Sequence, residues 1–383
     1  MRRGGALGLA IGALVLSAAF LAGCGSSDAA APTQDTGGDA GSCAGTIAVM
    51  ASAGSADSIQ PAQMNWARVA LDAFNAKRGS SFTIEPSNVN DETNLAGPEA
   101  KRLAADPAVV GVVGPASSAV TEIAGPIFDA ANLAYVSPSA TAVSLTDGHL
   151  KLFFRVVANN NQQANAIVRL VTSSLHPKTV LVVDDREIYS TNLTKIITDN
   201  LSKDHTNLNR VSVDVGQADY ADVVAKIGTS TNVVVMPFVN PGDAQRLADQ
   251  IRAAGKDPAI VGGDAMFSLN DFDVPGAYVP TYAPDVSKMA DGAATVKLYS
   301  EIFGDLAPFA ATAYEAMETV ATAALQSCRN GQATRDGVAK ALPDVRIPST
   351  LLGNSVAFDA HHELIGSRYW MYQIEGGTYR LIS

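Results

Sequence analysis

The chain from Val109 to Ser118 reads VVGVVGPASS. Its first five residues have no polar alternation, which predicts a strand buried on both faces, as in a parallel sheet covered by helices. The small and hydroxyl residues that follow lead into a helix predicted from about residue 119. This stretch therefore favours an α/β fold in which buried strands end at helix N-termini.

The same alternation extends to both sides of this stretch. Strands are predicted at 46–51, 82–86, 134–136, 179–183, 211–215, 232–236 and 259–261, and helices at 61–77, 99–105, 119–131, 161–174, 190–202, 220–227 and 242–254. These elements form two similar series that meet near Arg155, which predicts two doubly wound parallel-sheet lobes. The order then changes, with helices at 287–303, 310–327 and 336–342 and strands at 355–358, 369–374 and 378–382.

This late change of order suggests that the chain returns to both lobes through several hinge crossings. The expected domains are 43–155 with 283–355 for the first lobe, and 156–282 with 356–383 for the second. The expected folded part, residues 43–383, is longer than the chain that one hydrophobic core usually supports, which also favours two lobes.

The N-terminus resembles a cleaved lipoprotein signal. Arg2 and Arg3 precede an apolar stretch, and Leu21-Ala22-Gly23-Cys24 ends it. The pattern predicts a signal peptide at residues 1–23 and acylation of Cys24, whereas an uncleaved membrane anchor would need about 20 apolar residues. Residues 24–42, rich in small and polar residues, are expected to form a lipidated flexible tether.

Composition narrows the class of function. The chain is 47% hydrophobic and 17% charged with a formal net charge of −11, and no cluster of Lys or Arg occurs, which argues against nucleic acid as a partner. Phosphate-loop, dinucleotide, zinc-protease and hydrolase-elbow motifs are absent from the sequence. The adjacent His361 and His362 with Glu363 could bind a metal, but a solvated turn is the favoured interpretation because neighbouring strand side chains face opposite ways. We therefore expect no metal site, no cofactor and no catalysis.

Two cysteines remain after Cys24 is acylated. Cys43 and Cys328 are an even pair in a compartment that permits disulfides. They could form a disulfide or stay as two packed thiols.

Hydroxyl residues follow two neighbouring predicted strands. Ser117 and Ser118 come after the first, and Ser137, Ser139 and Thr141 come after the next. Helix N-termini at the carboxyl ends of parallel strands offer unpaired N–H groups to an anion. Each serine could instead only cap its helix.

From residue 46 to the end, the chain resembles the leucine/isoleucine/valine-binding family of type I periplasmic binding proteins, which serve ABC importers. The similarity rests on segments that are weak alone but specific in their order: VVGVVG, VSPSAT at 136–141, Phe154-Arg155, the segment from Asp184 to Tyr189, IRAAG at 251–255, Gly262-Gly263-Asp264 and Phe358-Asp359. The resemblance implies the type I fold. It also puts Cys43 and Cys328 in the same lobe, where a disulfide is geometrically feasible.

The resemblance also implies the ligand-binding residues. Ser118 and Thr141 match hydroxyls that bind the carboxylate and ammonium of an amino acid, and Ser139 matches a residue that contributes backbone groups. Tyr189 matches an aromatic residue that closes on the ligand, and Asp264 falls where an acid pairs with the ammonium. Ala116, on the same junction as Ser118, completes the expected set.

The side-chain pocket departs from the family. Ile59 stands where an aromatic residue often covers the ligand side chain, and the alignment leaves open which residue of 238–240 meets the ligand. An amino acid or a similar small zwitterion is therefore expected, with leucine itself not assured.

Together these features predict a monomeric substrate-binding protein, anchored by lipid on the outer face of the cytoplasmic membrane. It would close around an amino-acid-like ligand by hinge motion and deliver it to an ABC permease. Two alternatives stay open: a receptor that reports the ligand to a sensor system, and an extracellular hydrolase whose catalytic groups assemble only in the fold.

Overall fold

The computed structural model describes residues 42–51, 59–89, 93–304 and 306–383, without the side chains of 59–61 and 308–309. The expected signal peptide, the tether, Cys24 and the side chain of Ile59 lie outside this description.

The first sheet is parallel throughout. Its strands are β1 (Ala44–Ala51), β2 (Ser81–Asn88), β3 (Val109–Val113), β4 (Tyr135–Ser137) and β5 (Phe153–Arg155). They lie in the order β2-β1-β3-β4-β5, so β3 is central and covered on both faces. The helices of this lobe are α1 (Ile59–Arg78), α2 (Thr93–Ala105), α3 (Ser118–Ala130), α8 (Ala293–Phe303), α9 (Thr312–Gln326) and α10 (Arg335–Ala341).

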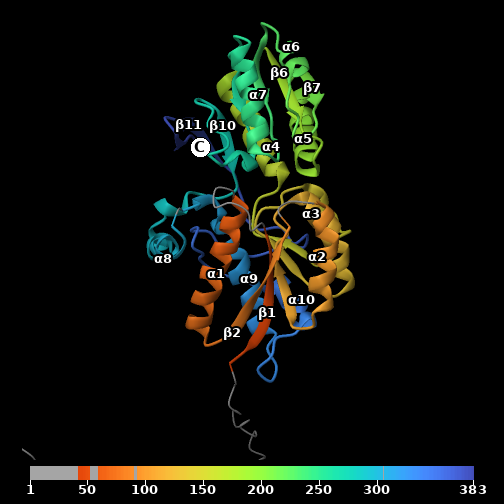
Figure 1. Ribbon diagram of the computed structural model, residues 1–383, viewed down its shortest axis with the longest axis vertical. Coiled ribbons are helices and arrows are strands. Elements are labelled where there is room, and N and C mark those ends of the chain that lie inside the picture. The colour runs from red at the N-terminus through yellow and green to blue at the C-terminus, as the bar shows by residue number, and fades with distance from the viewer. Residues whose placement is uncertain (1–41, 52–58, 90–92, 305) are drawn as a thin grey trace, which may run out of the picture. The chain divides into compact units, whose positions relative to one another are not determined.

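Helices cover both faces of this sheet. One core joins the sheet to α1, α9 and α10, and the other joins it to α2 and α3. In Figure 1, α1 and α9 lie on one side of this sheet, and α2 and α3 lie on the other. Gly111 permits the close approach of α9, because a Cβ at this position would lie 2.8 Å from Cγ1 of Val320. The continuous apolar run of β3 thus meets helices on each side, which is the doubly wound arrangement expected from the sequence.

The second sheet is mixed. Its strands are β6 (Thr179–Asp184), β7 (Asn207–Ser212), β8 (Thr231–Val235), β9 (Ala259–Val261), β10 (Tyr278–Thr281), β11 (Trp370–Glu375) and β12 (Thr378–Leu381). They lie in the order β12-β11-β10-β9-β8-β6-β7, and only the pairs that involve β11 are antiparallel. Its helices are α4 (Asn160–Leu170), α5 (Ile188–Lys203), α6 (Ala221–Ala225) and α7 (Pro241–Ala253). The helices α4 and α5 cover one face, and α6 and α7 cover the other.

Single turns connect these elements. The 3-10 turns are η1 (Val143–Thr146), η3 (Asp264–Met266), η4 (Val286–Lys288), η5 (Ala290–Gly292), η6 (Pro308–Ala311) and η7 (Leu342–Asp344), and η2 (Val171–Leu175) is a π turn that ends α4.

Some predicted boundaries are wrong. The strand expected at 211–215 lies earlier in the chain, since β7 ends at Ser212. Because β7 is an edge strand whose side chains are mostly exposed, it forms without the apolar run on which the prediction depended. The predicted helix at 287–303 is helical only from Ala293, after two 3-10 turns. The short strands β5 and β10 are additional to those predicted, because each has too few residues for a clear period.

The return to the second lobe comes later than expected. Residues 355–358 make only isolated bridges rather than a strand. Val356, Phe358 and Leu364 pack in the core of the first sheet. Residues 356–364 therefore belong with the first lobe, and the chain passes to the second lobe between Leu364 and β11. Two earlier crossings follow β5 and β10.

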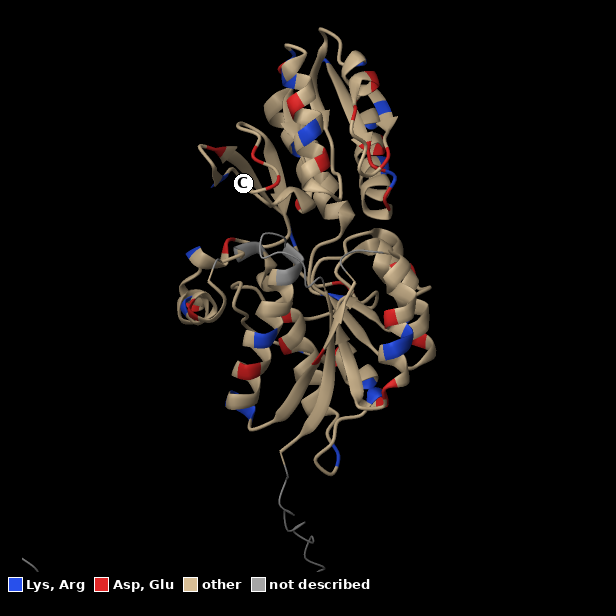
Figure 2. Cartoon of the chain, viewed as in Figure 1, with Lys and Arg blue, Asp and Glu red and all other residues tan. Residues whose placement is uncertain are grey.

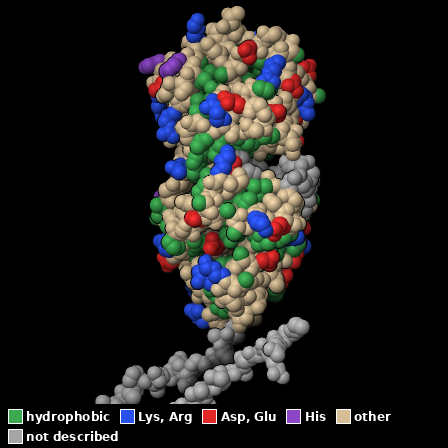
Figure 3. Space-filling model, turned by 90° about the vertical axis from the view of Figure 1, so that its left-hand side faces the viewer, with side chains coloured by type: hydrophobic (Ala, Val, Ile, Leu, Met, Phe, Trp, Pro, Cys, Tyr) green, Lys and Arg blue, Asp and Glu red, His purple; other side chains and the backbone are tan. Residues whose placement is uncertain are grey.

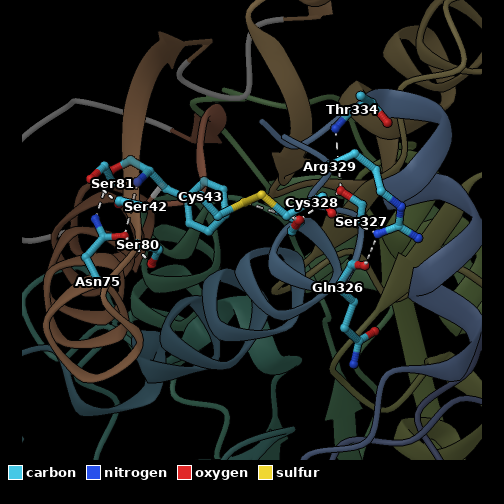
Figure 4. Close-up of a disulfide and its surroundings, with 12 residues drawn as sticks. Ser42, Cys43, Asn75, Ser80, Ser81, Gln326, Ser327, Cys328, Arg329 and Thr334 are labelled. Carbon is cyan, nitrogen blue, oxygen red and sulfur yellow. Dashed lines mark hydrogen bonds between the residues drawn. A yellow bond between two sulfur atoms is a disulfide. The ribbon is translucent and has the colours of Figure 1, made fainter. Parts of the chain in front are cut away.

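A disulfide joins the two cysteines of the folded part. Cys43 directly precedes β1 and Cys328 follows the end of α9, with their Cα atoms 6.1 Å apart (Figure 4). Cys43 is buried and both residues pack in the same core of the first lobe. The bond therefore fixes the start of the first strand to the end of α9, through two cysteines that are 285 residues apart in the chain.

Charged side chains are spread over both lobes. Figure 2 shows Lys and Arg interspersed with Asp and Glu along the helices, and Figure 3 shows the same mixing over one face. Within the described ranges, none of the helices combines the length and the apolar character that crossing a membrane requires.

Candidate functional site

The hydroxyl residues of the first lobe lie together at the carboxyl ends of β3 and β4. Ser117 caps α3, since its Oγ accepts a hydrogen bond from the amide of Val120 at 3.3 Å. Ser118 does not cap the helix: its Oγ accepts from the amide of Ala142, 3.1 Å away on the neighbouring junction. The capping alternative therefore accounts for Ser117 but not for Ser118.

Serines of the second junction complete this link. Ser137 donates to the carbonyl of Pro115 at 2.6 Å, and Ser139 donates to the carbonyl of Ala116 at 2.6 Å. Gln63 of α1 donates in turn to Ser139 Oγ at 2.9 Å. The structure thus brings the two junctions into one hydrogen-bonded unit beside the N-terminus of α3, where amide groups favour an anion.

Thr141 lies on the same unit and touches the start of the second lobe. Thr141 is buried, and its carbonyl accepts a hydrogen bond from the amide of Asn160, the first residue of α4, at 2.8 Å. Because α4 begins directly after the first crossing, this hydrogen bond joins Thr141 to the chain segment that connects the two lobes.

In the second lobe, Tyr189 and Asp264 form one cluster. The Tyr189 hydroxyl accepts from the amide of Asp264 at 3.1 Å and from Nε2 of Gln163 at 3.2 Å. Gly263 makes room for this contact, because a Cβ there would lie 2.1 Å from the Tyr189 hydroxyl oxygen. Tyr369 donates to Oδ2 of Asp264 at 2.6 Å.

Burial dominates the ionisation of this cluster. Desolvation raises the pKa of Asp264 to about 6, although hydrogen bonds from Tyr369, Tyr189 and Gln163 lower it. The pKa of Tyr189 is raised well above its usual value, mainly by burial and then by the charge of Asp264. Asp264 is therefore a buried acid held by neutral hydrogen-bond donors, an arrangement that a cationic group would stabilise.

A buried ion pair lies where β5 ends. Arg155 is fully buried and its Nε donates to Oε2 of Glu363 at 2.8 Å. Nη1 of the same guanidinium donates to the carbonyls of Ala140 at 3.1 Å and Ala142 at 2.8 Å, on either side of Thr141. Burial acts to raise the pKa of Glu363, but the hydrogen bond and charge of Arg155 bring it below the ordinary value. Arg155 therefore fixes the loop that carries Thr141 to the segment before the third crossing.

This ion pair corrects the expectation of a solvated turn at 361–363. Only His361 is exposed, since the ring of His362 stacks on Phe154 with centroids 3.9 Å apart and Glu363 pairs with Arg155. No local pattern points to these partners, because they lie 208 residues earlier in the chain. Across the described part of the chain, no group of His, Cys, Asp or Glu side chains is arranged to hold a metal ion.

The loop of residues 238–240 lies between β8 and α7 in the second lobe. Phe238 is fully buried against Tyr220, and Asn240 caps α7. Val239 between them is partly exposed. Val239 packs at the edge of the core that includes α4 and α5, and its amide donates to Oδ2 of Asp185 at 2.6 Å, so all three residues have structural contacts of their own.

Three residues of the cluster and its surroundings were not anticipated. Gln63, Gln163 and Tyr369 carry no motif, and their partners are 76, 26 and 105 residues away along the chain. Their role follows only from contacts made after folding.

Comparison with known proteins gives consistent matches. The family model described as periplasmic binding protein matches residues 45–378. A Leu/Ile/Val-binding protein of Rhizobium johnstonii is 25% identical over 324 residues, which are 82% of this chain and 86% of the relative. A Leu/Ile/Val-binding protein homologue of Brucella suis is 25% identical over 285 residues, 73% of this chain and 75% of the relative.

Solved structures share the fold. A leucine-binding protein from Thermotoga maritima superposes with a TM-score of 0.79 at 18% identity, covering 88% of this chain and 97% of that chain. A branched-chain amino acid transporter substrate-binding protein from Streptococcus pneumoniae, in complex with isoleucine, superposes with a TM-score of 0.76 at 22% identity. The match covers 89% of this chain and 99% of that chain. The two α/β lobes are those of type I periplasmic binding proteins.

Proposed function

We propose, from the premise that this chain belongs to the periplasmic binding protein family, that it captures a small amino-acid-like ligand and delivers it to an ABC permease. Its relatives are Leu/Ile/Val-binding proteins, which are substrate-binding proteins rather than enzymes. The observation that carries the proposal is the buried acid of the second lobe, Asp264, which has only neutral hydrogen-bond partners.

The chemistry of an amino acid fits the two groups of residues. Ser118, Thr141 and the start of α3 supply hydroxyl and amide donors for a carboxylate, while Ser139, whose hydroxyl donates to the carbonyl of Ala116, holds the two junctions together beside them. Asp264 supplies the acceptor for an ammonium group. We propose that ligand contacts with both lobes favour the closed form. Ligand binding then shifts the equilibrium between the open and closed forms towards the closed form, which the permease recognises. The lobes in this proposal are residues 43–155 with 283–364, and 156–282 with 365–383.

Replacing Asp264 with asparagine should weaken binding of an amino acid by about 2–5 kcal/mol, because the ligand ammonium loses its buried counter-charge. We would first screen leucine, isoleucine, valine, other amino acids and amides by thermal shift, then measure affinity by calorimetry. Since the pKa of Asp264 is about 6, wild-type affinity should fall as the pH drops below about 6, and the variant should lose this dependence. The exposed Asp249 of α7, changed to asparagine, is the control. Equal affinity in wild type and Asp264→Asn would mean that this acid lies outside the site or that the ligand has no ammonium group.

We propose that acylation of Cys24 holds the protein on the outer face of the cytoplasmic membrane. Cys24→Ala should release the protein from the membrane fraction or leave its precursor uncleaved, because the thiol that carries the lipid is missing. Fractionation and immunoblotting of cells that produce either form would measure this. Cys328→Ala is the control, and it should stay with the membrane. Unchanged anchoring and processing of Cys24→Ala would rule the lipid anchor out.

A further inference from the structure

Tyr369 lies between the buried acid and the crossings. It is 9% exposed and directly precedes β11. Its hydroxyl is 2.6 Å from Oδ2 of Asp264 and 3.4 Å from the carbonyl oxygen of Ala158. A hydroxyl has one proton, and the shorter distance to a charged acceptor assigns that proton to Asp264.

The surroundings of Tyr369 come from all the crossings. Ala158 belongs to the segment after β5, and Tyr282 belongs to the segment after β10. The rings of Tyr282 and Tyr369 meet edge to face, with centroids 6.3 Å apart and an interplanar angle of 78°. Tyr369 itself ends the last crossing. The side chain that donates to Asp264 is therefore fixed by segments that all run between the lobes.

The groups that face Asp264 are neutral. Tyr189 of α5 and Gln163 of α4 act on it through hydrogen bonds, as does the backbone amide of Ala265. The neighbouring Arg368 is exposed, with its guanidinium over the ring of Trp370 at 4.7 Å from the centroid. None of these partners is a cation, and among them the hydrogen bond from Tyr369, at 2.6 Å, lowers the pKa of Asp264 most.

We propose that Tyr369 is a positioning residue of the ammonium site: its hydroxyl keeps Asp264 ionised and oriented for a cationic ligand, and its fixed place among the crossings holds that geometry. This inference rests on the proposed function for its ligand. Its first consequence, the ionisation of Asp264, can be measured without any ligand.

The ligand-free test is an NMR titration of protein labelled with ¹³C at the aspartate carboxyl groups. Comparison with Asp264→Asn identifies the Asp264 resonance. In wild type it should titrate near pH 6, and in Tyr369→Phe its pKa should be higher, because a donor to the ionised form is gone. Tyr220→Phe is the matched control, since it removes another buried hydroxyl of the same lobe, one that is not among the hydrogen-bond partners of Asp264. Tyr369→Gln keeps a neutral N–H donor, so the pKa of Asp264 in this variant should lie between its values in wild type and in Tyr369→Phe. This variant also provides the test if the phenylalanine variant does not fold.

The second test uses isoleucine as the probe in calorimetry at pH 6 and pH 8.5. Tyr369→Phe should bind about fivefold or more weakly than wild type at pH 6, and the difference should shrink at pH 8.5, where Asp264 is ionised in both proteins. A merely structural loss would weaken binding equally at both pH values, and that result would overturn the proposal. An Asp264 resonance that titrates identically in wild type, Tyr369→Phe and Tyr369→Gln would also overturn it. If wild type binds neither isoleucine nor any other amino acid, the proposed function fails, while the titration still decides the role of Tyr369.

Discussion

Arg155→Met should lower the free energy of unfolding by about 3–5 kcal/mol, because it leaves the mostly buried carboxylate of Glu363, whose side chain is 15% exposed, without its counter-charge. Glu363 would keep only neutral donors, namely the hydroxyl of Thr146 at 2.7 Å and Nδ2 of Asn159 at 3.0 Å. The variant also loses the guanidinium bonds to the carbonyls of Ala140 and Ala142. Urea denaturation followed by circular dichroism measures the difference.

The pH dependence gives this prediction a second readout. Because the folded pKa of Glu363 lies below its ordinary value, the pair contributes stability above the unfolded pKa, and this contribution is lost as the pH falls through the folded pKa. The acid sensitivity that arises from this pair should therefore be missing in Arg155→Met.

A matched control is available on the surface of the second lobe. Arg186 pairs with Asp214, but both side chains are more than half exposed. Arg186→Met should cost no more than about 1 kcal/mol, since solvent screens such pairs. A double variant, Arg155→Met with Glu363→Leu, should recover part of the loss because no charge stays buried alone. If Arg155→Met is no less stable than Arg186→Met, the ion pair is not needed for folding.

Removing the disulfide should cost about 3–5 kcal/mol, because the bond closes a loop of 285 residues and so restricts the unfolded chain. We would compare wild type with a Cys43→Ala and Cys328→Ala double variant by urea denaturation, with and without reductant. Reductant should destabilise wild type towards the variant and leave the variant unchanged. Two free thiols found by mass spectrometry in protein isolated without reductant would contradict the bond.

The fold follows largely from local patterns in the sequence. The apolar run of β3 and the regular spacing of the helices predict two doubly wound lobes, because burial on both faces demands such runs. The edge strand β7 was misplaced because one side of an edge strand has no neighbour, so polar residues suffice.

The positions of the candidate site residues can be predicted from the sequence, but their contacts cannot. Ser118, Ser139, Thr141, Tyr189 and Asp264 follow strand ends, which is a position that sequence can reveal. The partners of these residues cannot be read in the same way. Tyr369 meets Asp264 and Glu363 meets Arg155 across 105 and 208 residues, and a tyrosine or glutamate in such a position looks like any other until the chain has folded.

In the lipid-anchored form proposed above, the place of the disulfide has a mechanical consequence. A force applied to the chain ahead of Cys43 reaches a covalent branch before it reaches β1, and one arm of that branch leads through Cys328 to the end of α9. The force is therefore shared between the first sheet and α9, which packs against it. Without the disulfide, the same force would separate β1 from its neighbouring strands one hydrogen bond at a time. Both arms end in the first lobe, so in the proposed lipid-anchored form we expect tension from the N-terminus to leave the second lobe free to turn.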